Sequence, residues 1–137
     1  VDHRIVFAGR IPYENLPNYL SAVDVCISTQ SNDLVGMVRT TGKLPLYLAH
    51  GKYVIATDVG EAKKVLPGVG CLLPYTGVRD DTHPGRLAIQ LQKLLDEPEQ
   101  FQIKEEAKQV AKNNFDYKML AQRLEKVMSN TYFKETI

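Results

Sequence analysis

The segment at positions 39–43, Arg-Thr-Thr-Gly-Lys, is the part of the sequence best suited to chemistry. Leu44, Tyr47 and Leu48 follow it at helical spacing, so a helix should begin here, with a threonine as its cap and Pro45 in its first turn. Exposed N–H groups at a helix start favour an anion, and neighbouring basic side chains strengthen that preference. The segment is therefore a candidate diphosphate site, with ordinary solvation of the basic residues as the alternative. Its candidate binding residues are Arg39, Thr40, Thr41, Gly42 and Lys43.

The other polar residues show no catalytic or metal-binding pattern. His3, His50 and His83 are scattered without metal-ligand spacing, and we expect them at the surface. The hydroxyl residues around Ser28 have no nearby base that would activate a nucleophile. The pair Asp80-Asp81 lies in a polar stretch and is expected to be solvated. Glycine-rich dinucleotide and ATP motifs are absent from the sequence.

The composition is that of an ordinary globular protein: of its 137 residues, 44% are hydrophobic and 24% are charged, and the net charge is +1. This near-neutral charge argues against a nucleic-acid partner. No apolar run approaches the roughly 20 residues of a transmembrane helix, and the first residues enter an apolar strand pattern without a signal-peptide design. Cys26 and Cys71 lie in apolar runs and are expected to be free thiols in a reducing cytosol. We therefore expect a cytoplasmic protein, with peripheral attachment at the inner membrane face as the alternative.

Short apolar runs alternate with helical patterns along the first half of the chain. This alternation predicts an α/β fold in which helices cover both sides of a parallel sheet. Strands are expected at residues 5–8, 25–28, 53–57 and 70–73. Helices are expected at residues 13–23, 43–50 and 60–66 and throughout the chain beyond Pro84, with breaks at Pro98 and Asn113-Asn114.

Loops that follow the strands are where an open parallel sheet binds ligands. They are expected at residues 9–12, 29–43 and 58–61, and a further polar loop at 76–84. Only four strands are visible, whereas doubly wound sheets usually have five or more. Either the sheet is small, or its opening strands belong to a longer parent.

Four stretches, in this order, resemble the second domain of the group 1 glycosyltransferases, which are family 4-like enzymes of the GT-B fold. The resemblance covers nearly the whole chain. It implies a Rossmann-like nucleotide-sugar-binding domain, incomplete at its N-terminal side, in residues 1–115. It also implies a C-terminal helix in residues 116–137 that packs toward a missing N-terminal domain. The matching stretches are residues 6–12, residues 22–28, residues 43–58, and Phe115-Asp116-Tyr117 with Leu120.

The same resemblance implies the donor-binding residues, but no catalytic residue. Gly9, Arg10 and Ile11 match a loop that contacts the nucleotide base, largely through backbone atoms. Residues 39–43 match the loop and helix start that face the sugar and phosphates. Val38 and Leu46 stand where the family has paired glutamates, the second of which receives the ribose hydroxyls. Since leucine cannot do this, either other groups hold the ribose or donor binding is lost.

The activity implied by the resemblance is transfer of a sugar from a nucleotide diphosphate sugar to a glycan, lipid or small-molecule acceptor bound by the missing domain. No metal or other cofactor is expected, because helix N-termini and basic side chains stabilise the departing diphosphate in such enzymes. The fragment alone is expected to be inactive. The alternative is a degenerate, non-catalytic domain with a structural or assembly role. A phosphoacceptor signalling domain is disfavoured, because Gly9-Arg10 replaces the acidic pair that it needs after the first strand.

Overall fold

A parallel sheet of three strands, in the order β1-β2-β3, forms the centre of the computed structural model, which describes residues 3–102 and 104–132. The strands are β1 (Val25–Ser28), β2 (Tyr53–Thr57) and β3 (Cys71–Leu73). Val25 aligns with Tyr53, and Ile55 aligns with Cys71. The prediction of an α/β fold with a parallel sheet is confirmed, and three of the four predicted strands form.

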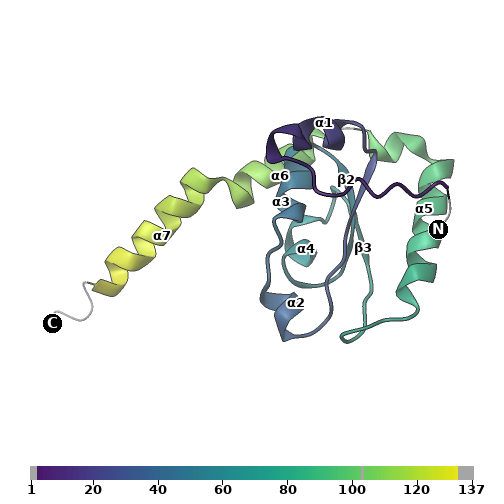
Figure 1. The fold of residues 1–137 in the computed structure, drawn as a ribbon. Coiled ribbons are helices and arrows are strands. Elements are labelled where there is room, and N and C mark those ends of the chain that lie inside the picture. Colours follow the sequence, from purple (N-terminus) through teal and green to yellow (C-terminus); the bar gives the residue numbers. More distant parts are fainter. Residues whose placement is uncertain (1–2, 103, 133–137) are drawn as a thin grey trace.

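Helices connect the strands and flank the sheet on two sides (Figure 1). They are η1 (Tyr13–Asn15), α1 (Leu16–Ser21), α2 (Leu34–Val38), α3 (Lys43–Ala49), α4 (Gly60–Val65), α5 (His83–Asp96), η2 (Pro98–Phe101), α6 (Glu105–Phe115) and α7 (Tyr117–Tyr132).

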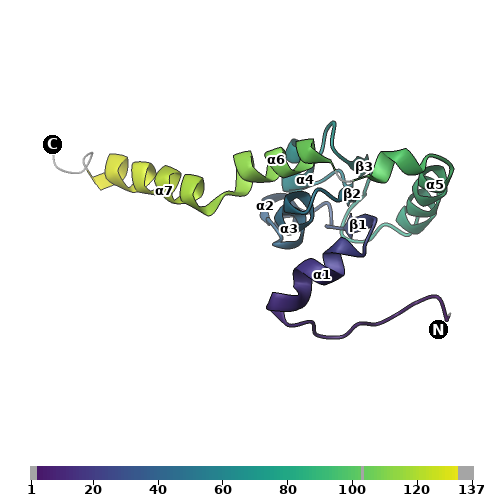
Figure 2. The same cartoon turned by 90° about the horizontal axis from the view of Figure 1, so that it is seen from above.

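The two faces of β2 pack against different helices, because successive side chains of a strand point to opposite sides. Val54 and Ala56 belong to a core that includes Leu44 and Leu48 of α3. Tyr53 and Ile55 belong to a second core. Figure 2 shows the resulting layers, with α3, α4 and α6 on one side of the strands and α5 on the other. The first core also includes Leu20 of α1 and Ala107 and Ala111 of α6, and the second includes Leu94 of α5.

The predicted strand at residues 5–8 is wrong. Ile5, Val6 and Phe7 are 55%, 84% and 81% exposed and form no strand. In Figure 2 this segment runs past the β1 side of the sheet without joining it. The apolar run predicted burial, but a strand also needs a neighbour for its backbone hydrogen bonds, and this segment has none among the described residues.

Two further differences concern helix boundaries. The expected loop after β1 contains the short helix α2, because Asp33 caps it by accepting a hydrogen bond from the Gly36 N–H at 2.8 Å. The expected break at Asn113-Asn114 lies two residues later, at Asp116. The side-chain amide of Asn114 donates to the Val110 carbonyl one turn earlier, so Asn114 supports the helix rather than ending it.

Helix α7 projects away from the rest of the molecule in both views (Figures 1 and 2). Tyr117, Leu124 and Val127 on this helix are 88%, 59% and 62% exposed. The expected packing of this helix against another domain stays a prediction. Among the helices described, none has the length and apolar character to cross a membrane.

Candidate functional site

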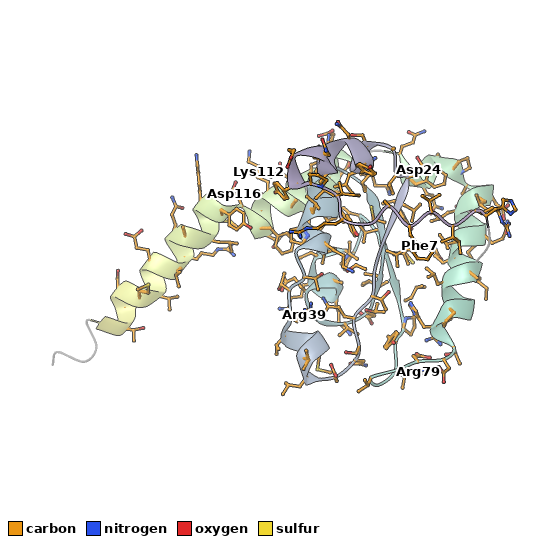
Figure 3. The ribbon with its side chains drawn as sticks, in the orientation of Figure 1. Phe7, Asp24, Arg39, Arg79, Lys112 and Asp116 are labelled. Carbon is orange, nitrogen blue, oxygen red and sulfur yellow. The ribbon has the colours of Figure 1, made fainter. Side chains whose placement is uncertain are left out.

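A polar pocket of about 300 Å³ lies where β1 ends. It is lined by three of the predicted binding residues, two from the segment between α2 and α3 and one at the start of α3, together with residues of α2 and of the loop that follows β1. Figure 3 shows Arg39 beside α2, at the end of the sheet that also carries Arg79 of the loop after β3. The pocket is lined by Thr29, Gln30, Ser31, Val35, Gly36, Arg39, Thr41 and Lys43.

The side chain of Thr57, at the end of β2, holds the backbone of Gln30, which lines the pocket. Its Oγ1 atom accepts a hydrogen bond from the Gln30 N–H at 2.9 Å and donates one to the Gln30 carbonyl at 3.0 Å. Thr57 is only 2% exposed, so this anchor is part of the core. The loop after β1 is also bonded to the loop after β3, at the opposite edge of the sheet, because the Asn32 N–H donates to the Gly77 carbonyl at 2.8 Å.

Two glycines allow backbone segments to approach each other closely beside the pocket. Gly36 of α2 lies against Ser31, and Gly60 of α4 lies against Gly36. A Cβ atom on Gly36 would lie 1.8 Å from the Ser31 carbonyl oxygen. Gly60, at the start of α4, has φ +58°, and a Cβ atom there would lie 2.7 Å from the Gly36 carbonyl oxygen. Because L-residues rarely adopt this φ and neither position has room for a side chain, the loop depends on both glycines.

Positive charge dominates the lining of the polar pocket. Arg39 and Lys43 line it together with no acidic residue, and neither forms an ion pair within residues 3–102 and 104–132. The nearby carboxylate of Asp33 is occupied in capping α2. Its pKa is lowered by the hydrogen bond from the Gly36 N–H and then by one from the Ser31 hydroxyl. The pocket is therefore suited to an anion.

Two residues that line the pocket have a side-chain atom that is buried without a hydrogen-bond partner in the described chain, Gln30 Oε1 and Thr41 Oγ1. The free hydroxyl of Thr41 corrects the expectation of a threonine cap, since Gly42 occupies the cap position of α3 and no side chain caps that helix. Gln30 was not among the predicted binding residues. The only cue to it was its position immediately after an expected strand.

A second cavity, the α3–α6 pocket, has a volume of about 690 Å³. Thr40 and Gly42 line it, so alternate residues of the 39–43 segment face the two cavities. Leu46 also lines the α3–α6 pocket, and its side chain packs against the larger core. Figure 3 places Lys112 and Asp116, which also line this cavity, at the junction of α6 and α7. The remaining lining residues are Tyr13, Pro45, Ala49, Lys108, Ala111, Phe115, Tyr117 and Leu120.

The predicted base-contacting residues are not brought to these cavities. Gly9, Arg10 and Ile11 line neither of them and lie in the extended segment before η1. Gly9 has φ +68°, which marks a bend in this segment. The structure therefore unites Arg39, Thr41 and Lys43 but not the complete predicted set.

The loop after β3 corrects two expectations about polar residues. His83, expected at the surface, is 8% exposed, and its ring meets Tyr75 edge-on with the centroids 5.1 Å apart. The Asp80 side chain, expected to be solvated, is 5% exposed and pairs with Arg86 at 2.5 Å. Hydrogen bonds from the Thr82 hydroxyl, the Thr76 N–H and Arg86 lower the Asp80 pKa despite its burial. These groups close the loop and do not line either cavity.

The two cysteines, in β1 and β3, are thiols with no disulfide between them. Cys26 and Cys71 are free, as predicted, and burial raises the pKa of Cys26 to about 11. Cys71 is only partly buried, and burial raises its pKa as well. Residues 3–102 and 104–132 contain no group of three or more histidine, cysteine, aspartate or glutamate side chains that could hold a metal ion.

Comparisons with protein-family models, with curated proteins and with solved structures found no match to this chain.

Proposed function

We propose that the chain is the donor-binding part of a glycosyltransferase and that its polar pocket binds the diphosphate of a nucleotide diphosphate sugar. The observation that carries the proposal is the presence of Arg39 and Lys43 in one pocket whose lining contains no carboxylate. The resemblance of the sequence to group 1 glycosyltransferases supports the same assignment, because it relates residues 39–43 to the sugar and phosphates. A Rossmann-like GT-B identity for the sheet belongs to this proposal.

In this function the two basic side chains stabilise the leaving group. The bond from the anomeric carbon to the diphosphate oxygen breaks as the acceptor oxygen bonds to that carbon, and the proton of the acceptor hydroxyl passes to the departing diphosphate. Negative charge then grows on the nucleoside diphosphate, and fixed positive groups stabilise it most strongly at that stage. The acceptor is held by another part of the enzyme, and closure of the two parts excludes water.

The α3–α6 pocket is the candidate location for the nucleoside. It adjoins the polar pocket through the 39–43 segment and has more than twice its volume, about 690 Å³ against about 300 Å³. Tyr13 in its lining is 81% exposed, so the ring is free to stack on a base. Leu46 offers the ribose no hydrogen bond, but the hydroxyl-bearing Thr40 lines the same cavity.

Titration of the 137-residue chain with UDP, GDP and ADP, followed by NMR, tests the proposal. We expect one nucleotide to shift the backbone amide signals of residues 29–31 and 39–43. The Arg39→Ala, Lys43→Ala double variant should weaken its binding at least tenfold, because each charge-assisted hydrogen bond contributes about 1.5–3 kcal/mol. The Arg79→Ala, Lys126→Ala variant is the control, since it removes the same charge from residues that line neither pocket.

The competing function is a non-catalytic domain that keeps the fold but does not bind a donor. The position of Leu46 favours it, because the side chain packs against apolar neighbours where the family has a ribose-binding glutamate. Two outcomes of the titration support this alternative: no shift with any nucleotide, or equal weakening by the double variant and its charge-matched control.

A further inference from the structure

Helix α7 carries an apolar stripe that is exposed along most of its length. Every residue from Leu120 to Thr131 is exposed, and the helix projects from the body of the molecule in both views (Figures 1 and 2). At the 100° per residue of an α-helix, the apolar side chains other than Met119 fall within one arc of about 120°. This arc, the α7 stripe, consists of Tyr117, Leu120, Ala121, Leu124, Val127 and Met128.

The start of α7 is fixed locally, but its apolar face lacks packing within the described structure. Asp116 Oδ1 accepts hydrogen bonds from the Lys118 and Met119 N–H groups at 2.8 and 3.2 Å and so caps the helix. A cap fixes where a helix begins, whereas most helical stability in proteins comes from burial of an amphipathic face. Burial of the α7 stripe would therefore stabilise the helix and remove apolar surface from water.

Basic residues lie on both borders of the α7 stripe. By helical geometry, Arg123 borders the stripe beside Val127, and Lys118 lies on the opposite border. Glu125, the one acidic residue of α7, shares the border with Lys118. The long stems of lysine and arginine can lie along an apolar surface while their charged ends stay in water. The stripe is thus suited to a partner that is apolar inside and anionic at its surface.

The width of the α7 stripe favours a membrane surface over a second helix. A coiled-coil seam is a narrow stripe that continues over several heptads. Helix α7 spans only about two heptads, and Ala121 and Met128 widen its apolar face beyond such a seam. A helix with a broad apolar face and basic residues beside it is the form that lies in a membrane interface, where anionic headgroups attract the basic side chains.

We infer that α7 binds the surface of an anionic phospholipid membrane. The stripe enters the apolar part of the interface, and Lys118 and Arg123 lie at the headgroup phosphates. Such binding does not depend on the proposed donor site, because α7 beyond Leu120 lines neither pocket. Another domain, as the family resemblance implies, and a second copy of the chain are the competing partners of the stripe.

Co-sedimentation of the 137-residue chain with lipid vesicles tests this assignment. We expect binding to vesicles of equal parts phosphatidylcholine and phosphatidylglycerol, with weaker binding at high salt or to phosphatidylcholine alone. The Leu124→Gln, Val127→Gln variant should bind the mixed vesicles at least about tenfold more weakly, because two apolar side chains no longer enter the interface. Ile89→Gln, Leu95→Gln is the matched control on α5, where the side chains are 62% and 70% exposed, and it should bind unchanged.

The basic residues have a separate test. The Lys118→Gln, Arg123→Gln variant should weaken binding to the mixed vesicles about 25-fold at low salt, because each basic side chain near an anionic surface contributes about fivefold. Its binding to phosphatidylcholine vesicles should not change. Lys63→Gln, Lys64→Gln removes the same charge from α4 and should leave both affinities unchanged.

Fluorescence locates the stripe directly, since the chain contains no tryptophan. The emission of Leu124→Trp should shift to the blue when mixed vesicles are added, and that of Leu95→Trp should not. Absence of binding to the mixed vesicles, or an equal loss in the α5 control, would overturn the inference. A dimer in sedimentation velocity that Leu124→Gln, Val127→Gln dissociates, without vesicle binding, would assign the stripe to a second copy instead.

Discussion

Strand β2 and the segment at residues 5–8 have similar apolar composition but opposite environments. Every residue of β2 is buried, whereas Val6 and Phe7 are 84% and 81% exposed. β2 has a strand on each side and helix-bearing cores on both faces. The N-terminal segment has neither within the described structure. The contrast shows that apolar side chains create a need for burial, which only neighbouring elements can meet.

Two adjacent aspartates, Asp80 and Asp81, show the same contrast between a buried and an exposed environment, here for polar side chains. Asp80 receives hydrogen bonds from Thr82, Thr76 and Arg86, and its side chain is 5% exposed. Asp81 pairs with Arg79 at 2.7 Å, but the two side chains are 79% and 86% exposed. An ion pair in full contact with water contributes little. We therefore expect Asp80, but not Asp81, to matter for stability.

The largest difference is expected between Ile55→Ala and Ile5→Ala. Ile55 is 1% exposed and Ile5 is 55% exposed. The first substitution should lower the free energy of unfolding by about 2–5 kcal/mol through lost burial and a cavity. The second should change it by less than about 0.5 kcal/mol. Urea denaturation followed by circular dichroism measures both. A loss above about 1 kcal/mol for Ile5→Ala would show that residues 5–8 do pack in solution.

A second matched pair, Gly36→Ala and Gly85→Ala, should shift stability in opposite directions. The new Cβ atom at Gly36 meets the Ser31 carbonyl oxygen, whereas at Gly85 in α5 it meets nothing within 4 Å. We expect a loss of about 1–3 kcal/mol at Gly36 and a gain of about 0.5–1 kcal/mol at Gly85. The same denaturation experiment decides the matter, and equal effects would mean that the loop after β1 relaxes around the new side chain.

Thr57→Val tests the link between β2 and the polar pocket. Valine keeps the shape of threonine but loses both hydrogen bonds to the Gln30 backbone, so the expected loss is about 1–3 kcal/mol. Hydrogen exchange of the Gln30 amide should accelerate at the same time. Thr76→Val, at an exposed position, is the matched control. Unchanged exchange at Gln30 would contradict the proposed anchoring role.

The smallest expected effect is the pH dependence that comes from Asp80. Its pKa in the folded protein is lowered, so its contribution to stability is fully present above the unfolded pKa of about 3.9 and is lost as the pH falls through the folded pKa. Asp80→Asn should therefore flatten the decline in melting temperature between about pH 5 and pH 2. Asp81→Asn serves as the charge-matched control, and a decline that is equally steep in Asp80→Asn would contradict the assignment.

The predicted binding segment was recovered only in part, for a reason that lies in the packing of distant elements. The sequence identified residues 39–43 from their charge and their position before a helix. It could not show that Arg39, Thr41 and Lys43 line one cavity while Thr40 and Gly42 line the other. Nor could it show that the Gln30 backbone is bonded to the side chain of Thr57, 27 residues away in the chain. These relations depend on how β1, β2 and α3 pack.

The sequence by itself determined the class of fold, because strand and helix periodicities and helix-ending glycines such as Gly51, with φ +67°, are local properties. It also determined that both cysteines are free. Only the tertiary structure decided which apolar runs are buried, which aspartate is sequestered, and which buried polar atoms lack partners. The physical reason is that burial and hydrogen-bond satisfaction are properties of neighbours in space, which periodicity along the chain does not specify.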